Sequence, residues 1–102
     1  METNGQQDTE RVKVMLRNLG TVNKNEVTLE NGSANLRLWF SYKTIVSFSA
    51  NAEGFYDNAT IQNYWSNTTG KLLDECEPDK AKRITQEEFN SRLSKAFKEV
   101  FK

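Results

Sequence analysis

The chain has 102 residues with 14 basic and 14 acidic side chains, no His, and one cysteine, Cys76. The lack of His excludes Ser/His/Asp and Cys/His catalytic pairs and Cys/His zinc sites, and one cysteine cannot form an internal disulfide. With 36% hydrophobic and 11% aromatic residues, the chain can bury a modest core, because aromatic side chains bury large areas. We therefore expect one small folded domain.

The cellular setting follows from what the sequence lacks. A single cysteine fits a reducing compartment. No apolar run approaches the roughly 18 residues that span a bilayer, and the first residues do not resemble a signal peptide. We expect a cytoplasmic protein that has no membrane partner.

The balanced charge is distributed in blocks along the chain. Segments 1–10 and 53–79 are net acidic, whereas segments 11–52 and 80–102 are net basic. Residues 1–10 are polar and aperiodic, which predicts a disordered tail. Residues 11–102 then form a single domain.

Alternating apolar residues predict the first two strands. Val12, Val14 and Leu16 fall on one side of a half-buried strand, and Val27 and Leu29 mark a second. The turn that follows spans residues 30–33, and we place Asn-Gly at its centre.

Two more strands follow this turn. The strand over residues 36–42 places Leu36, Leu38, Phe40 and Tyr42 on one face and Trp39 on the other. The strand over residues 44–49 is rich in β-branched and aromatic residues, with Val46 and Phe48 directed inward.

The central segment predicts a loop, a fifth strand and a short helix. Residues 50–56 contain Asn and Gly and are expected to form a loop, and residues 60–65 form the fifth strand. Residues 66–69 offer N-caps for a helix that continues to about Cys76, and Pro78 ends it.

The final segment predicts an amphipathic helix. Thr85 and Glu88 form a capping box, and Glu88 pairs with Arg92 four residues later. Apolar residues then recur every three or four positions: Phe89, Leu93, Phe97, Val100 and Phe101. The fold class is therefore α+β, a single domain with an antiparallel sheet of four to five strands, a short helix and a C-terminal amphipathic helix packed on the sheet.

The search for catalytic and metal-binding motifs favours a protein that is not an enzyme. There is no glycine-rich phosphate loop, Walker motif, metal-ligand cluster or calcium loop. The acidic residues between 74 and 79 are typical of a solvated loop beside a proline. We expect no catalytic residue, no metal and no cofactor.

Three residues form the first candidate binding site. Arg37, Trp39 and Lys43 combine an aromatic ring with cations, the pattern that binds single-stranded nucleic acid. Structural cover of Trp39 by a helix is the favoured interpretation, because sheets are often buried on both faces by helices, and an exposed contact residue is the other. The basic C-terminal segment adds to such a surface, whereas the neutral total charge counts against a dedicated nucleic-acid binder.

A second candidate site precedes the short helix. Thr68 and Thr69 would cap it, and its free N–H groups beside Lys71 would suit an anion. Capping alone is the favoured interpretation, because lone caps are far commoner than anion sites.

Separate charged blocks also suit recognition of another protein. A neutral domain with basic and acidic patches can steer toward a complementary protein surface. It can also meet a second copy of itself in antiparallel fashion, which would make a homodimer.

Two stretches carry a resemblance to a known family: residues 38–48, LWFSYKTIVSF, and residues 64–73, YWSNTTGKLL. They are similar to a family of small uncharacterised phage and archaeal proteins, a domain of unknown function with Phe-Ser-Tyr-x-Thr and Trp-Ser-x-Thr-Thr-Gly-Lys patterns. The resemblance covers about residues 36–90 and departs from the family at Leu72, where a His is expected. It implies a cytosolic protein of viral or mobile-element origin and implies no activity.

These observations lead to one expected function and one alternative. We expect a small phage-type accessory protein that binds a host protein in the host cytoplasm, in a host-takeover or anti-defence role. The alternative is an accessory protein that binds nucleic acid through its aromatic and basic surface.

Overall fold

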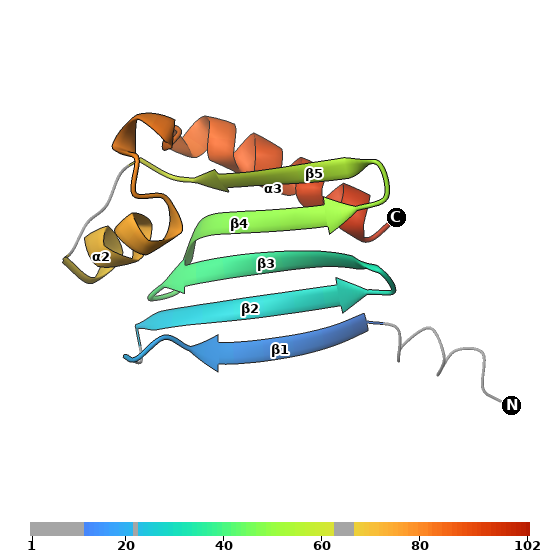
Figure 1. The fold of residues 1–102 in the computed structure, drawn as a ribbon, viewed down its shortest axis with the longest axis horizontal. Coiled ribbons are helices and arrows are strands. Elements are labelled where there is room, and N and C mark those ends of the chain that lie inside the picture. The colour runs from blue at the N-terminus through green and yellow to red at the C-terminus, as the bar shows by residue number, and fades with distance from the viewer. Residues whose placement is uncertain (1–11, 22, 63–66) are drawn as a thin grey trace, which may run out of the picture.

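The structure is a computed structural model that describes residues 12–21, 23–62 and 67–102. Its centre is a five-stranded antiparallel sheet in which every strand pairs with its neighbour in sequence (Figure 1). The strands are β1 (Val12–Asn18), β2 (Lys24–Asn31), β3 (Ala34–Ser41), β4 (Thr44–Ala52) and β5 (Phe55–Thr60). With the helices, this confirms a single compact α+β domain. The tail predicted for residues 1–10 lies outside the described residues.

The hairpin between β2 and β3 differs from its prediction by one residue. Asn31 pairs with Ala34, so Gly32 and Ser33 form the turn and Asn31 is the last residue of β2. Gly32 has φ +62°, a conformation that glycine adopts without strain. The predicted Asn-Gly centre is therefore wrong, because the glycine takes the first turn position rather than the second.

A bulge in β4 lies opposite the end of β3. The register shifts between Trp39 and Phe40, and Val46 is the extra residue on β4. Val46 and Phe48 are both buried, as predicted. Tyr42, which the alternation placed with the core residues, lies instead in the turn with φ +58° and is exposed, because the strand ends one residue earlier.

The fifth strand begins earlier in the chain than predicted. Residues 50–56, expected to be a loop, contain the end of β4 and the start of β5, joined by a tight turn in which Gly54 has φ +74°. Of the strand predicted over 60–65, Thr60 ends β5 and Ile61 makes only an isolated parallel bridge to Ile84. Residues 63–65 lie outside the described residues.

Two helices and a 3-10 turn follow the sheet: α2 (Asn67–Cys76), η1 (Lys80–Lys82) and α3 (Gln86–Val100). The Thr85 hydroxyl accepts a hydrogen bond from the Glu88 amide at 3.2 Å, so the predicted N-cap is confirmed. The Glu88 carboxylate accepts from Arg92 at 3.3 Å, which confirms the predicted pair.

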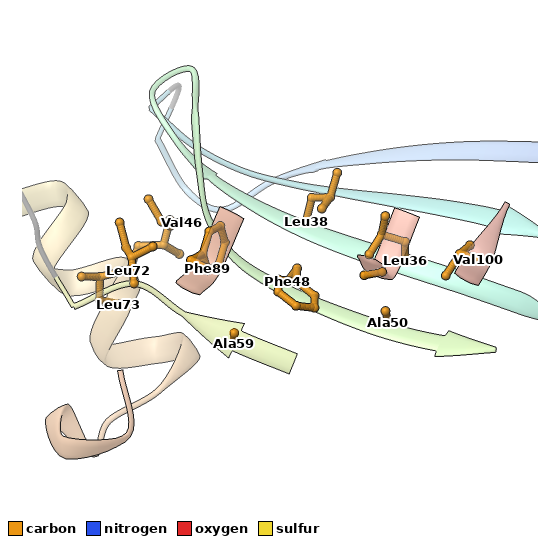
Figure 2. Packing of buried hydrophobic residues seen from close by; sticks show 12 residues of the cluster. Leu36, Leu38, Val46, Phe48, Ala50, Ala59, Leu72, Leu73, Phe89 and Val100 are labelled. Carbon is orange, nitrogen blue, oxygen red and sulfur yellow. The ribbon is translucent and has the colours of Figure 1, made fainter. Parts of the chain in front are cut away.

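The core lies between the sheet and α3 (Figure 2). The rings of Phe48 and Phe89 meet edge to face, with centroids 5.5 Å apart. Leu72, at the position where the family pattern expects a His, is fully buried in the same cluster. The fully or nearly fully buried apolar residues are Leu36, Leu38, Val46, Phe48, Ala50, Ala59, Ile61, Leu72, Leu73, Phe89, Ala96 and Val100.

Candidate binding surfaces

The strand pairing divides the sheet into an apolar face against α3 and a polar face on the other side. In an antiparallel sheet, residues directly opposite each other share a face. One row across all five strands consists of Arg17, Glu26, Trp39, Ser47 and Thr60, and the next row consists of Met15, Thr28, Arg37, Ser49 and Asn58. We call these two rows the polar face.

A carboxylate binds two cations on the polar face. One oxygen of Glu26 accepts from Arg17 at 3.1 Å and from Arg37 at 2.8 Å. The Glu26 side chain is nearly buried, whereas both arginines are partly exposed. The Arg37 guanidinium also lies 4.9 Å from the centre of the Trp39 ring. Two positive charges thus share one negative charge here.

A hollow of about 590 Å³ lies over the polar face, bordered by the end of α2 and the segment after it. The Ser47 hydroxyl bonds to Thr60 at 2.7 Å and to the Ala59 carbonyl at 3.0 Å. Burial raises the pKa of the Cys76 thiol to about 11, and a hydrogen bond with Ser47 opposes this shift only in part. The thiol is therefore neutral at physiological pH, which is typical of an unreactive cysteine.

The structure brings together only two residues of the first candidate site. Arg37 and Trp39 stack on the polar face, and Trp39 is half-buried there, facing away from α3. Lys43 lies in the turn between β3 and β4 and borders separate small hollows beside Tyr42.

The second candidate site is arranged differently from its prediction. Helix α2 is described from Asn67 onward, so Thr68 and Thr69 lie within its first turn rather than before it. Thr69 is fully buried, and its hydroxyl shares a 2.6 Å hydrogen bond with that of Ser41. The side chain of Thr68 lies outside the described residues, and Lys71 is exposed on α2. The buried Ser41 hydroxyl explains why Thr69 turns inward.

The apolar face contains a surface that the sequence reasoning missed. Helix α3 packs mainly on β3, β4 and β5, and Figure 1 shows it behind β5 and β4. On the same face, Val12, Val14 and Leu16 of β1 are 42%, 65% and 71% exposed. The three residues share one face of the strand as predicted, but the prediction that this face is buried is wrong. Together with the half-buried Val27 and Leu29 of β2, we call them the open strip.

The reason for this exposure is geometric. Neighbouring strands lie about 4.8 Å apart and a helix is about 10 Å wide, so one helix covers two to three strands. Five strands with a single long helix must leave about two strands bare. The element count was the signal in the sequence that indicated such a surface.

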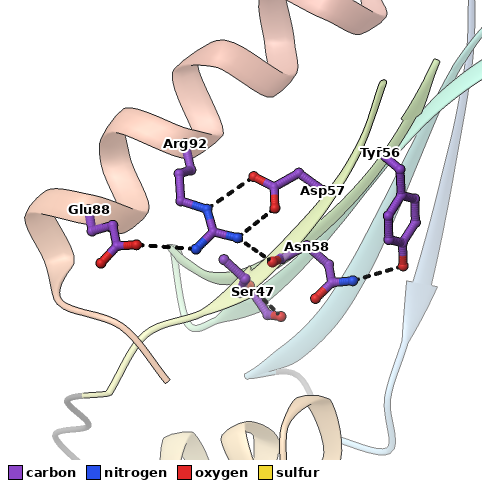
Figure 3. A network of polar contacts seen from close by, with 7 residues as sticks. Ser47, Tyr56, Asp57, Asn58, Glu88 and Arg92 are labelled. Carbon is purple, nitrogen blue, oxygen red and sulfur yellow. Dashed lines mark hydrogen bonds and ion pairs between the residues drawn. The ribbon is translucent and has the colours of Figure 1, made fainter. Parts of the chain in front are cut away.

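The two edges of the sheet are treated differently. At β5, Arg92 donates to both carboxylate oxygens of Asp57 and, at 3.0 Å, to the Asn58 backbone carbonyl (Figure 3). The hydrogen bond to Asp57 is the main cause of the raised pKa of Arg92. Ile84 also bonds to this edge, since its amide donates to the Thr60 carbonyl at 2.9 Å. The β5 edge is thus largely covered.

The protein is thus a small α+β domain with a meander sheet. One helix covers about half of the apolar face, the open strip is the rest of that face, and the polar face is on the opposite side of the sheet. A family model described as "Family of unknown function (DUF8033)" matches residues 11–91. The chain belongs to this family, so the expected membership in an uncharacterised family is confirmed. No curated protein and no solved structure matches the chain.

The described ranges show neither a metal-binding cluster nor a membrane-spanning helix. They contain no group of three or more Cys, Asp or Glu side chains placed to hold a metal ion. None of the helices described in them combines the length and the apolar character that crossing a bilayer requires.

Proposed function

We propose that this protein is not an enzyme and acts by binding another protein. The observation that carries the proposal is the open strip. Val14 and Leu16, on the same face of β1, each expose about two thirds of their surface. Contiguous exposed apolar surface on a small protein commonly marks an interaction site. Burying these side chains in an interface would favour association through the hydrophobic effect.

The chemistry of the polar face also favours binding over catalysis. The hydroxyls in the hollow bond to each other, and the Cys76 thiol stays protonated. Glu26 is engaged with two arginines. None of these groups is arranged as an activated nucleophile beside a base.

The biological setting is part of the same proposal. The resemblance of residues 38–48 and 64–73 to small phage and archaeal proteins favours an accessory protein of a phage. Its partner would then be a host protein in the cytoplasm of the infected cell, in a host-takeover or anti-defence role. A homodimer is a further form of the same binding function.

Nucleic-acid binding remains the alternative function, because Arg37 and Trp39 are adjacent on the polar face. Glu26 neutralises part of the positive charge there. The Arg37 guanidinium lies over the Trp39 ring and covers a face on which a base would have to stack. These contacts make a protein partner the better supported choice.

The test compares two substitutions on the same strand. Leu16→Lys places a charge in the open strip, and Met15→Lys places the same charge on the polar face of β1. Tagged wild-type protein and both variants are incubated with a lysate of the host. We expect a host protein to be retained by wild type and by Met15→Lys, and to be lost with Leu16→Lys.

Three results would count against the proposal. Equal retention by all three proteins, or retention of nothing specific, would remove the open strip as the binding surface. Oligonucleotide binding that weakens steeply with salt and disappears in Arg37→Ala would support the alternative function.

A further inference from the structure

We propose that the partner binds by adding an extended strand to the free edge of β1, and that this strand alternates apolar residues with Asp or Glu. The inference rests on the proposed function and specifies the chemistry of the partner. It derives from the backbone groups of β1 that point away from β2, from the charges on the two faces of β1 and from the way β2 pairs with it.

The backbone pairing identifies which groups of β1 face outward. In an antiparallel ladder, hydrogen-bonded and non-hydrogen-bonded pairs alternate. The Leu19 amide donates to the Lys24 carbonyl at 2.8 Å, which makes that pair a hydrogen-bonded one. Counting back by twos along β1, Lys13, Met15 and Arg17 bond to β2.

The second register confirms this assignment. The Tyr42 amide donates to the Asn23 carbonyl at 2.7 Å, so alternate β2 residues, Val27 and Leu29 among them, bond to β3. The β2 residues between them, including Glu26 and Glu30, therefore direct their backbone hydrogen bonds to β1. The N–H and C=O groups of Val14 and Leu16 therefore point to the open edge of the sheet.

The open edge is well suited to accept a strand. Every residue of β1 is exposed. At the β5 edge Arg92 donates to a backbone carbonyl, whereas no side chain of the described residues is seen to do the same at β1. A row of outward N–H and C=O groups provides the main-chain bonds of strand addition, and alternate side chains provide the specificity.

The side chains of β1 define what the added strand must carry. On the apolar face it presents Val12, Val14 and Leu16, and on the polar face it presents Lys13 and Arg17. It carries no acidic residue. A partner strand should place apolar residues on the first side and carboxylates on the second.

Strand β2 shows this complement directly. Across the β1–β2 ladder, Glu30 lies opposite Lys13 and Glu26 lies opposite Arg17, while Leu29 faces Val14. The Arg17–Glu26 pair closes to 3.1 Å. Opposite charges and apolar pairs in register each stabilise a sheet. The sequence of β2 is thus the template for a strand on the other edge of β1.

The charges of β1 argue against a second copy as the partner. A two-fold antiparallel pairing centred on Met15 would place Lys13 directly opposite Arg17 of the other copy. Pairings centred on Val14 or Leu16 place one of these cations opposite Met15 and gain no ion pair. Like charges in directly opposed positions destabilise a sheet.

The first experiment uses a peptide with the sequence of residues 23–31, NKNEVTLEN, and a control peptide in which both Glu residues are replaced by Lys. Each is titrated into the full-length protein at low salt while amide hydrogen exchange is followed by NMR. We expect saturable binding of the first peptide, at least tenfold slower exchange of the Val14 and Leu16 amides, and about tenfold weaker binding of the control peptide.

A matched pair of variants separates backbone pairing from side-chain contact. Val14→Pro removes an outward amide that β2 does not use, and proline is tolerated on such an edge. Val14→Ala removes the side chain but keeps the amide. We expect peptide binding to be lost in Val14→Pro and only weakened in Val14→Ala. Circular dichroism should show that both variants are folded.

The following outcomes would overturn the inference. They are equal binding of the two peptides, no slowing of the two amides, or equal effects of the two Val14 variants. A host protein that is lost with Leu16→Lys yet retained by Val14→Pro would leave the proposed function intact and remove strand addition. A dimer of the protein alone that Val14→Pro dissociates would replace the proposed partner with a second copy.

Discussion

Arg83 is a buried cation, and its ion pair with Asp74 allows a quantitative test of how the segment after α2 is held. The Arg83 side chain is 2% exposed, while that of Asp74 is 63% exposed. The guanidinium donates to the Asp74 carboxylate at 2.7 Å and to the Glu77 carbonyl at 2.9 Å. Replacing Asp74 with Ala removes the carboxylate and leaves the Glu77 carbonyl as the acceptor for the buried guanidinium.

The expected cost follows from the burial of the two partners. Leaving a buried charge without its partner costs about 3–5 kcal/mol. Because Asp74 is largely exposed, water can take its place in part, and we expect Asp74→Ala to lower the free energy of unfolding by about 2 kcal/mol. In an Arg83→Met background the same substitution should cost roughly nothing, because no charge remains to be paired.

Urea denaturation of the four proteins measures this difference. With an m-value of about 2 kcal/mol per M, Asp74→Ala should lower the midpoint by about 1 M in the wild-type background only. The coupling energy of the double-mutant cycle should then be about 2 kcal/mol. An equal cost of Asp74→Ala in both backgrounds would refute this account of the pair.

Two further predictions concern the β3–β4 turn and the cysteine. Tyr42→Gly should raise the free energy of unfolding by about 0.5–1 kcal/mol, because it relieves the left-handed backbone at φ +58°. Lys43→Gly should lower the free energy of unfolding, because the backbone at Lys43 is not left-handed. A lower free energy of unfolding in both variants would contradict this explanation. Because burial raises the Cys76 pKa from 9.0 to about 11, alkylation of the native thiol at pH 8 should be about 100-fold slower than in urea-unfolded protein. The native rate should keep rising with pH toward 11, and comparable rates at pH 8 would show that the thiol is ionised in the fold.

The elements with clear local signals were predictable from the sequence. The Thr85 cap and the apolar stripe after it define α3, since both depend on residues within the helix itself. The alternation through Leu36 and Leu38 likewise located β3, because one face of that strand is buried by α3. These predictions needed no knowledge of the rest of the fold.

The hairpin of β4 and β5 was not predictable in the same way. Asn51, Tyr56 and Asn58 lie on the polar face, so the segment has the composition of a polar loop although residues 50–52 pair with residues 55–57. The turn depends on Gly54, which a loop would also explain. The pattern of a strand is weak where one face is polar and the other carries small residues such as Ala50 and Ala59.

The candidate sites depended on contacts between distant segments. Arg37 and Trp39 were identified correctly as neighbours on one face, because they are two residues apart on one strand. Thr69 was misassigned because its partner, Ser41, lies 28 positions away. The open strip was missed because burial of β1 depends on how far α3 reaches across the sheet, and alternation alone does not specify that.

The order of the strands has a consequence for how the chain folds. Every strand pairs with the one before or after it in sequence, so each hairpin can form by closing a short loop, and the entropy lost at each step is small. The contacts that span many residues, such as that of Phe48 with Phe89, form when α3 docks. A topology with so many local pairings favours rapid folding for a protein containing a β-sheet. Formation of the sheet by successive hairpins would place docking of the C-terminal helix late in the folding reaction.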